Sequence, residues 1–307
     1  MATENAPSAN SISQWDEQNI ASLLTLDEVA PGQYRSRMSD ANLNGRSFGG
    51  QLLGQAMMAA CREAPPERSA TAMQMLFLQG ADPLLPIDFK VSSIQDGKRV
   101  ASRHVTANQV GGRQILDAQL TFAVTLDAPS HQSSLAHCEE PELLPGLSSL
   151  PPAWVDQLTL LGGYSTRARL GIDFRLPQLQ DQLSPEGAKS KLRFWLKARQ
   201  ALPDDPAIHA AAFAYLSDWW INFAALLAHM HSLVPQRSLY TSSLNHSIWL
   251  HRQPRADAWM HFDCESPVAA DGRGLTVARI HDQAGVLIAS VTQECLMTYT
   301  DGGPRLA

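Results

Sequence analysis

The stretch from Ala211 to Ala228 constrains the fold of this chain most, because it is apolar on nearly every face and yet carries one carboxylate, Asp218. A helix that is hydrophobic all round is a buried helix. An aspartate inside it must be hydrogen-bonded, ion-paired or protonated. Upstream, Asp204-Asp205-Pro206 places a capping carboxylate before a proline, so we expect a helical region from Asp205 to Ala228, with Asp218 more than three turns in. Two interpretations remain open: a structural acid bonded to Asn222 or to backbone, or a poised acid or base.

The composition narrows the class of protein. The 307 residues are 44% hydrophobic and 18% charged, with a formal net charge of -6, which argues against a nucleic-acid-binding protein. The four cysteines lie far apart without a CxxC pair, as expected for free thiols in a reducing compartment, and we predict a cytoplasmic location. No window has about 18 consecutive apolar residues, so no membrane span is expected.

The order of the predicted elements indicates two similar α+β units. An apolar helix over Phe48–Cys61 precedes four strand-like runs, which extend over Ala72–Leu78, Leu85–Ser93, Val100–Ala107 and Gln114–Val124. After a proline-rich linker, the second unit has a strand over Leu192–Ala198, the helical region with Asp218, and runs over Ser243–His251, Ala258–Glu265, Leu275–His281 and Val286–Met297. The predicted domains are a flexible tail over 1–20, a first unit over 21–127, a linker over 128–165, a second unit over 166–300 and a tail over 301–307.

The two units match each other in sequence. Asp96-Gly97 aligns with Asp271-Gly272 at an offset of roughly 175 residues, which indicates one internal duplication. Two such copies can share a continuous sheet and protect each other's edges. The copies differ in their helices: the first has no ionisable residue between Phe48 and Cys61, whereas the second has Asp218.

Other chemistries find little support. Gly45-Arg-Ser-Phe-Gly49 matches a nucleophile elbow around Ser47, but a polar loop precedes it where an elbow needs a buried strand. The ten histidines show neither HExxH nor finger spacing, and no nucleotide-binding glycine motif follows a strand. We therefore expect neither a metal nor a cofactor.

Several short motifs follow one another along the two units: Phe48-Gly-Gly-Gln51, Tyr215-Leu-Ser-Asp218, Asn245-His-Ser-Ile-Trp-Leu-His-Arg252, Cys264-Glu-Ser-Pro267 with Gly272-Arg-Gly274, and Asp282–Glu294. In this order they resemble the acyl-CoA thioesterase II (TesB-like) family, over about residues 20–300 without the linker. The resemblance implies an α+β double hotdog fold, in which two antiparallel sheets each wrap a central helix. It also implies hydrolysis of fatty acyl-CoA to free acid and CoA by an activated water, without a covalent intermediate.

The resemblance also implies which residues hold the water. They are Asp218 as the base, with Ser243 and Gln293 as water-positioning residues; Ser242 is a neighbouring rival of Ser243. A buried carboxylate with a raised pKa is a suitable general base. Asn245 stands where an aspartate usually precedes the His-Ser pair, and we expect it to remove a charge near the site.

Two alternatives remain: an enoyl-CoA hydratase or dehydratase of the same fold, and a non-catalytic acyl-CoA-binding module. The expected partners are the acyl-CoA substrate and further copies of the chain, as a dimer or tetramer. Candidates for contacts to the CoA phosphates are Arg252, Arg255 and Arg273.

Overall fold

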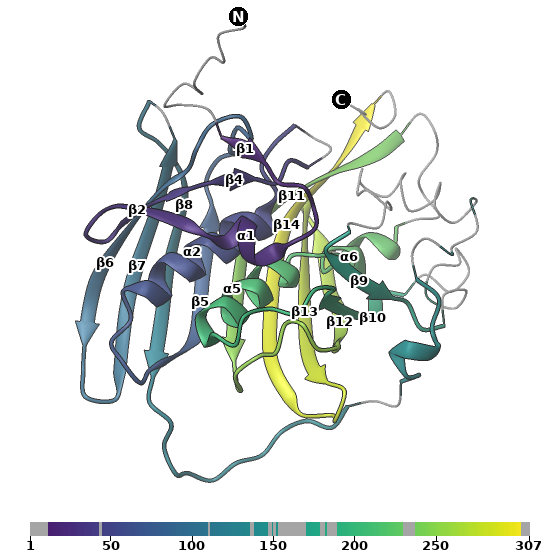
Figure 1. Ribbon diagram of the computed structural model, residues 1–307. Helices are drawn as coiled ribbons and strands as arrows, with labels where there is room; N and C mark the ends of the chain where they lie inside the picture. Colours follow the sequence, from purple (N-terminus) through teal and green to yellow (C-terminus); the bar gives the residue numbers. More distant parts are fainter. Residues whose placement is uncertain are drawn as a thin grey trace, which may run out of the picture.

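The computed structural model of the chain describes residues 12–42, 45–109, 111–135, 138–146, 149, 152, 170–178, 182, 189–229 and 237–301. In this part of the chain one large antiparallel sheet curves around two central helices (Figure 1). The sheet has twelve strands in the order β2-β3-β6-β7-β8-β5-β11-β14-β13-β12-β10-β9. Strands β5 and β11 join its two halves at the centre through the pairs from Ala72–Trp249 to Leu76–Asn245.

The N-terminal copy forms the first half of the sheet. Its strands are β2 (Leu26–Ala30), β3 (Gln33–Ser36), β5 (Ser69–Phe77), β6 (Asp88–Asp96), β7 (Val100–Gln109) and β8 (Arg113–Ala123), and its central helix is α2 (Gly49–Arg62). A short helix, α1 (Ile20–Leu24), and the two-stranded pair β1 (Ser13–Gln14) and β4 (Met38–Ser39) precede α2. The predicted helix and four strands of this copy are confirmed, although β6 begins at Asp88 rather than Leu85, after Pro86, which has no backbone N–H to donate.

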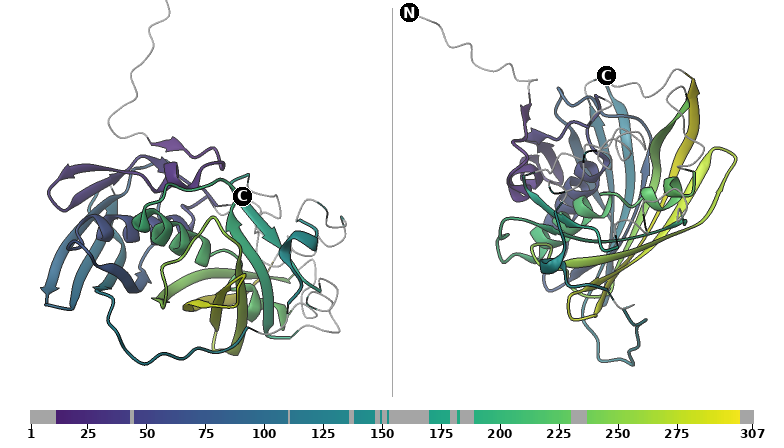
Figure 2. Two further views of the ribbon diagram at one scale, coloured as in Figure 1. Left: turned by 60° about the horizontal axis from the view of Figure 1, so that its bottom comes forward. Right: turned by 90° about the vertical axis from the view of Figure 1, so that its right-hand side faces the viewer.

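The C-terminal copy repeats this arrangement. Its strands are β9 (Ile172–Arg175), β10 (Lys191–Ala198), β11 (Arg237–Leu250), β12 (Met260–Ala270), β13 (Arg273–Asp282) and β14 (Leu287–Asp301), and its central helix is α5 (Pro206–Ser217). A further short helix, α6 (Phe223–Leu227), follows α5, and a 3-10 turn, η1 (Pro141–Leu143), lies in the segment between the copies. The two central helices lie side by side within the curved sheet (Figure 2).

The sheet register fixes the duplication at an offset of 173 residues. Adding 173 to both members of the pair Arg103–Leu120 gives the pair Thr276–Gln293. The same offset takes the bulge between Ala70 and Ala72 to the bulge between Ser243 and Asn245. The predicted duplication and the double hotdog fold are therefore confirmed.

The single helical region predicted over Asp205–Ala228 is wrong. Helix α5 ends at Ser217, Asp218 is its C-cap, and Trp220 has φ of 62° before the chain re-enters a helical turn in α6. A bulky residue at positive φ is strained. Here tertiary packing holds it: Trp220 is fully buried and its ring stacks on Phe223, with centroids 4.6 Å apart.

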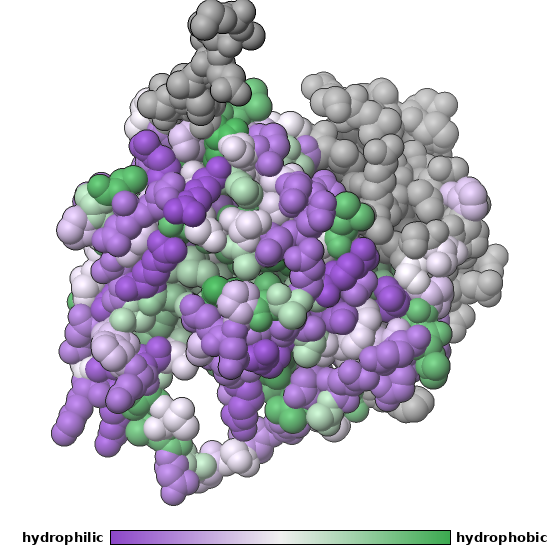
Figure 3. All heavy atoms as spheres, in the orientation of Figure 1, coloured by the Kyte–Doolittle hydropathy of each residue, from purple (hydrophilic) through white to green (hydrophobic). Residues whose placement is uncertain are grey.

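The hydrophobic core fills the space between the helices and the inner face of the sheet, and it includes residues from both copies. On the face drawn in Figure 3, hydrophilic residues predominate and apolar ones form small separated groups.

Trp15, which the sequence assigns to the flexible tail, is 6% exposed and contacts Tyr215 edge-on. The predicted domain boundaries otherwise stay predictions, and much of the linker lies outside the described residues. In the described part of the chain, no helix is long and apolar enough to cross a membrane.

Candidate active site

Asp218 lies where α5 ends, in the interior between the two copies. It is 4% exposed, and burial raises the pKa of its carboxyl group from 3.8 to about 7. Hydrogen bonds from Gln293, the backbone N–H of Gly50 and Ser243 partly oppose this rise because they stabilise the ionised form. The carboxyl group can therefore exchange a proton near neutral pH.

The N-terminus of α2, from the other copy, faces this carboxylate. Gly50 donates its backbone N–H to Asp218, and a Cβ on Gly49 would lie 2.6 Å from Asp218 Oδ2. Free N–H groups and the positive end of the helix dipole favour an anion there. The site is therefore assembled from both copies.

Glycines on α2 make this approach possible. A Cβ on Gly50 would lie 2.4 Å from the Tyr215 carbonyl oxygen, and one on Gly54 would lie 2.9 Å from that of Ala211. Residues four apart share a helix face, so two glycines on α2 pack against two residues of α5. Any larger residue on this face of α2 would push the helix away from α5 and its N-terminus away from Asp218.

Gln293, on β14, connects the polar groups of the site. It is fully buried, and its Nε2 donates to Asp218 Oδ1 and to Ser243 Oγ, both at 2.7 Å. The structure thus brings together the three residues that the sequence names, Asp218, Ser243 and Gln293.

A β-bulge in β11 gives Ser243 its direction. Residues three apart on a regular strand point to opposite faces of the sheet, but the register of β11 against β14 shifts between Ser243 and Asn245. Both Ser243 and His246 therefore point inward and reach Gln293. Ser243, rather than its rival Ser242, contacts the amide.

His246 completes the polar cluster. It is fully buried, its Nδ1 lies 2.7 Å from Gln293 Oε1, and its Nε2 lies 2.9 Å from Ser217 Oγ. Burial lowers the pKa of His246 from 6.5 to about 4, so the ring is neutral at physiological pH. Its inward direction follows from the bulge, which sequence periodicity does not reveal.

Two sequence expectations about neighbouring residues are wrong. Asn245 lies on the outer face, where its Nδ2 donates to Glu294 Oε2 at 2.9 Å, because alternation along β11 turns it away from His246. Asn222 was a candidate partner of Asp218, but the break after α5 removes the helical spacing that would have brought them together.

Other residues that the sequence singles out make contacts of their own. Ser47 Oγ lies 3.4 Å from Ser39 Oγ. Arg255 pairs with Asp204 at 2.5 Å, and Arg273 with Glu294 at 3.1 Å. Arg252 donates to its neighbour's carbonyl, His251 O, at 2.8 Å.

The chemistry available here is general-base catalysis. A half-buried hydroxyl, a fully buried amide and a carboxylate with a pKa near 7 meet around one point, and helix N–H groups face the carboxylate. Such a set can orient a water molecule and accept its proton.

Two family models match the chain, one in each copy. Residues 38–123 match the acyl-CoA thioesterase N-terminal domain, and residues 138–297 match the acyl-CoA thioesterase C-terminal domain. Both members of the pair that forms the site, α2 and α5, fall within these matches.

Individual proteins are similar over nearly the whole length. The chain is 30% identical to acyl-coenzyme A thioesterase 8 of Rattus norvegicus, over 90% of this chain and 87% of the relative. It is 26% identical to acyl-CoA thioesterase 2 of Haemophilus influenzae, over 92% and 98%. Among solved structures, the acyl-CoA thioesterase II TesB2 of Mycobacterium marinum is 31% identical with a TM-score of 0.75, and the match covers 92% of this chain and 99% of that one.

Proposed function

This chain belongs to the acyl-CoA thioesterase family, and from that premise we propose that it hydrolyses fatty acyl-CoA to a free fatty acid and CoA with Asp218 as general base. The observation that carries the proposal is the single amide of Gln293, which donates to both Asp218 and Ser243 at 2.7 Å. The raised pKa of Asp218, about 7, makes it a stronger base than a carboxylate in solvent.

The reaction needs no covalent intermediate. Asp218 takes a proton from a water molecule as its oxygen attacks the thioester carbonyl carbon, the C–S bond breaks, and the CoA sulfur leaves as a thiolate that gains a proton. Gln293 and Ser243 orient the water in this scheme, because both already contact each other beside the carboxylate. In this scheme both copies contribute to the reaction. The C-terminal copy holds the water, and the N-terminus of α2, from the N-terminal copy, stabilises the carboxylate that activates the water.

The base role predicts a pH dependence. Only the ionised form of Asp218 can accept a proton, so kcat/KM rises with pH and levels off above the pKa of about 7. The measurement is thiol release from octanoyl-CoA across a pH series, with a rate that stays flat below pH 7 contradicting the assignment.

The decisive experiment replaces the base. Asp218→Asn keeps the shape of the side chain and should lower kcat about a hundredfold or more, since the amide cannot accept the proton. The matched control is Glu63→Gln, which changes the acid at the C-cap of α2 in the N-terminal copy and should leave kcat within about twofold. Activity of Asp218→Asn within about tenfold of the unaltered protein would end the base role.

The same assays separate the alternatives. Loss of crotonyl-CoA absorbance without thiol release would favour a hydratase or dehydratase, and saturable acyl-CoA binding without turnover would favour a binding module. The proposal also includes a cytoplasmic location and assembly into a homo-oligomer. Gel filtration with light scattering would test the assembly.

A further inference from the structure

The side-chain amide of Gln293 must lie in one of two orientations, and only one suits an ionised Asp218. The amide has a donor end and an acceptor end. With Nε2 toward Asp218 and Ser243 it donates to both, as observed. Turned by half a rotation, it would aim its carbonyl oxygen at the carboxylate, and the two acceptors would repel each other.

Asp218 and Ser243 do not settle this orientation alone. A serine hydroxyl can donate or accept, and a protonated carboxyl group can donate to an amide oxygen. The group at the other end of the amide therefore matters. That group is His246, whose Nδ1 lies 2.7 Å from Gln293 Oε1.

The contact with Gln293 Oε1, an amide oxygen that can only accept, requires the ring form of His246 that donates from Nδ1. The ring is fully buried and neutral, so Nε2 then accepts. Ser217 Oγ lies 2.9 Å from Nε2 and donates to the Ala214 carbonyl oxygen at 2.8 Å. Its single proton serves one acceptor at a time, so this ring form requires the proton to turn from Ala214 O to Nε2.

We propose that His246 is a positioning residue, which donates from Nδ1 to Gln293 Oε1 and so holds the donor end of the amide against Asp218 and Ser243. The proposal rests on the function proposed above. The chain of contacts runs from Ser217 on α5 through His246 to Gln293 and back to Asp218, the residue after Ser217. These contacts form a closed ring of polar groups at the C-terminal end of α5.

The N-terminal copy supports a role specific to the site. The 173-residue offset places Met73 at the position of His246 and Leu120 at that of Gln293. Both are fully buried and apolar. The fold accommodates a methionine at this position, so the histidine is present where there is an amide to orient.

Two amide substitutions form a matched test. In His246→Asn the new amide nitrogen can occupy the place of Nδ1 and donate to Gln293, whereas in His246→Gln it reaches toward the place of Nε2 and Ser217. We expect His246→Asn to keep kcat for octanoyl-CoA within about threefold and His246→Gln to lower it about tenfold or more, with KM little changed in both. In His246→Gln the rise of kcat/KM with pH should also move to higher pH, because the donor that stabilises the ionised Asp218 is no longer held in place.

A double variant tests whether His246 acts through Gln293. In a Gln293→Leu background, His246→Gln should cause little further loss, since the amide that it orients is gone. Equal kcat values for His246→Asn and His246→Gln would overturn the proposal. So would a loss from His246→Gln in the Gln293→Leu background as large as the loss that it causes alone. If His246→Gln does not fold by near-UV circular dichroism, His246→Met, copied from the N-terminal copy, replaces it with the same expected loss.

The outcomes are distinguishable from failure of the proposed function. If Asp218→Asn retains activity, the base role fails whatever His246 does. If Asp218→Asn is inactive while His246→Asn and His246→Gln both match the unaltered protein, only the positioning role fails.

Discussion

The two copies share a backbone but differ in the side chains at one set of equivalent positions. At the 173-residue offset, Gln293 corresponds to Leu120, and Ser243 corresponds to Ala70. The β-bulge that turns Ser243 inward is present in both copies, although in the N-terminal copy the residue at the position of Ser243 is the apolar Ala70. The backbone geometry of the site is thus a property of the fold, and a few side chains decide which copy holds it.

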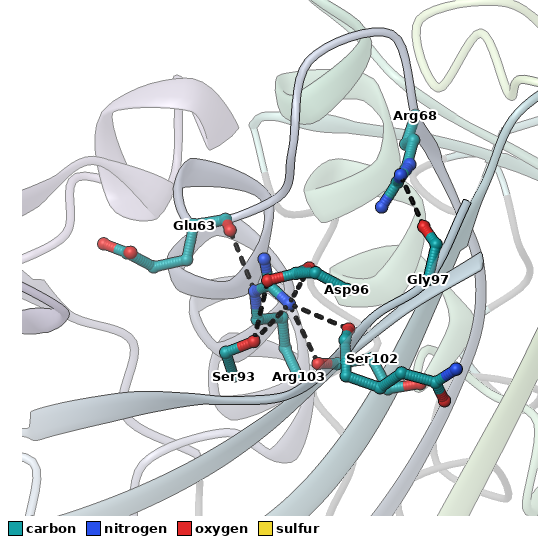
Figure 4. Close-up of polar contacts among 8 residues, drawn as sticks. Glu63, Arg68, Ser93, Asp96, Gly97, Ser102 and Arg103 are labelled. Carbon is teal, nitrogen blue, oxygen red and sulfur yellow. Dashed lines mark hydrogen bonds and ion pairs between the residues drawn. The ribbon is translucent and has the colours of Figure 1, made fainter. Parts of the chain in front are cut away.

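A second difference is a buried arginine in the N-terminal copy where the C-terminal copy has a threonine. Arg103 occupies the position of Thr276 and is 4% exposed. Its Nε donates to the carbonyl oxygen of Glu63, the C-cap of α2, at 2.8 Å, and its Nη1 pairs with Asp96 at 2.8 Å (Figure 4). Glu63 holds the place that Asp218 has at the end of α5.

The comparison teaches that the acids at the two equivalent helix ends have different surroundings. At the end of α2, Glu63 is partly exposed, and the Arg103 guanidinium donates to its carbonyl oxygen, which suits the negative end of the helix dipole. At the end of α5, Asp218 is buried, and burial raises its pKa to about 7. Burying an acid in this way costs stability.

The largest expected effect comes from making the C-terminal copy resemble the other. Gln293→Leu removes the amide that joins Asp218 to Ser243, and kcat should fall about a hundredfold or more. Steady-state thiol release measures this. The reverse change at the equivalent position, Leu120→Gln, buries an unpartnered amide and should lower stability without affecting kcat per folded molecule. Loss of less than about fivefold in Gln293→Leu would show that the amide does not position the water.

Stability should depend on pH through Asp218. Its folded pKa of about 7 exceeds 3.8, so its stabilising contribution is present below about pH 4 and lost as pH rises through 7. At about 1.4 kcal/mol per pKa unit, Asp218→Asn should gain roughly 4 kcal/mol of unfolding free energy, relative to the unaltered protein, between pH 4 and pH 8. Urea titrations at both pH values test this.

A smaller effect is expected from Arg103→Thr, which gives the N-terminal copy the residue type that the C-terminal copy has at this position. The loss of the bonds to Glu63 O and Asp96 should lower the free energy of unfolding by about 2–3 kcal/mol. Arg35→Gln is the matched control, because the side chains of its pair with Asp88 are 42% and 45% exposed and the loss should cost less than about 1 kcal/mol. Equal losses in the two variants would show that burial of Arg103 adds nothing.

The smallest effect is expected from Asn245→Asp on the outer face. It places a second carboxylate beside Glu294 but points away from Asp218, so kcat should stay within about twofold and stability should fall by less than about 1 kcal/mol. Kinetics and urea unfolding measure both quantities. A large change in kcat would mean that the charge acts across the sheet.

The sequence alone determined the duplication and named the candidate site residues. Turn dipeptides and alternating strands recur at nearly constant spacing, and a carboxylate in an apolar segment is conspicuous wherever it lies. Asp218, Ser243 and Gln293 were therefore predictable from local patterns and the family resemblance. Their distances were not, because they come from a helix end and two strands far apart in the chain.

Only the tertiary structure decided the rest. Trp220 at positive φ ends the helix early because aromatic packing outweighs helical propensity, and this makes Asp218 a C-cap. One bulge in β11 turns His246 toward Gln293 and Asn245 away from it. The N-terminus of α2 reaches Asp218 because glycines let two helices of different copies touch. Each result depends on contacts between segments distant in sequence, to which the pattern of neighbouring residues is blind.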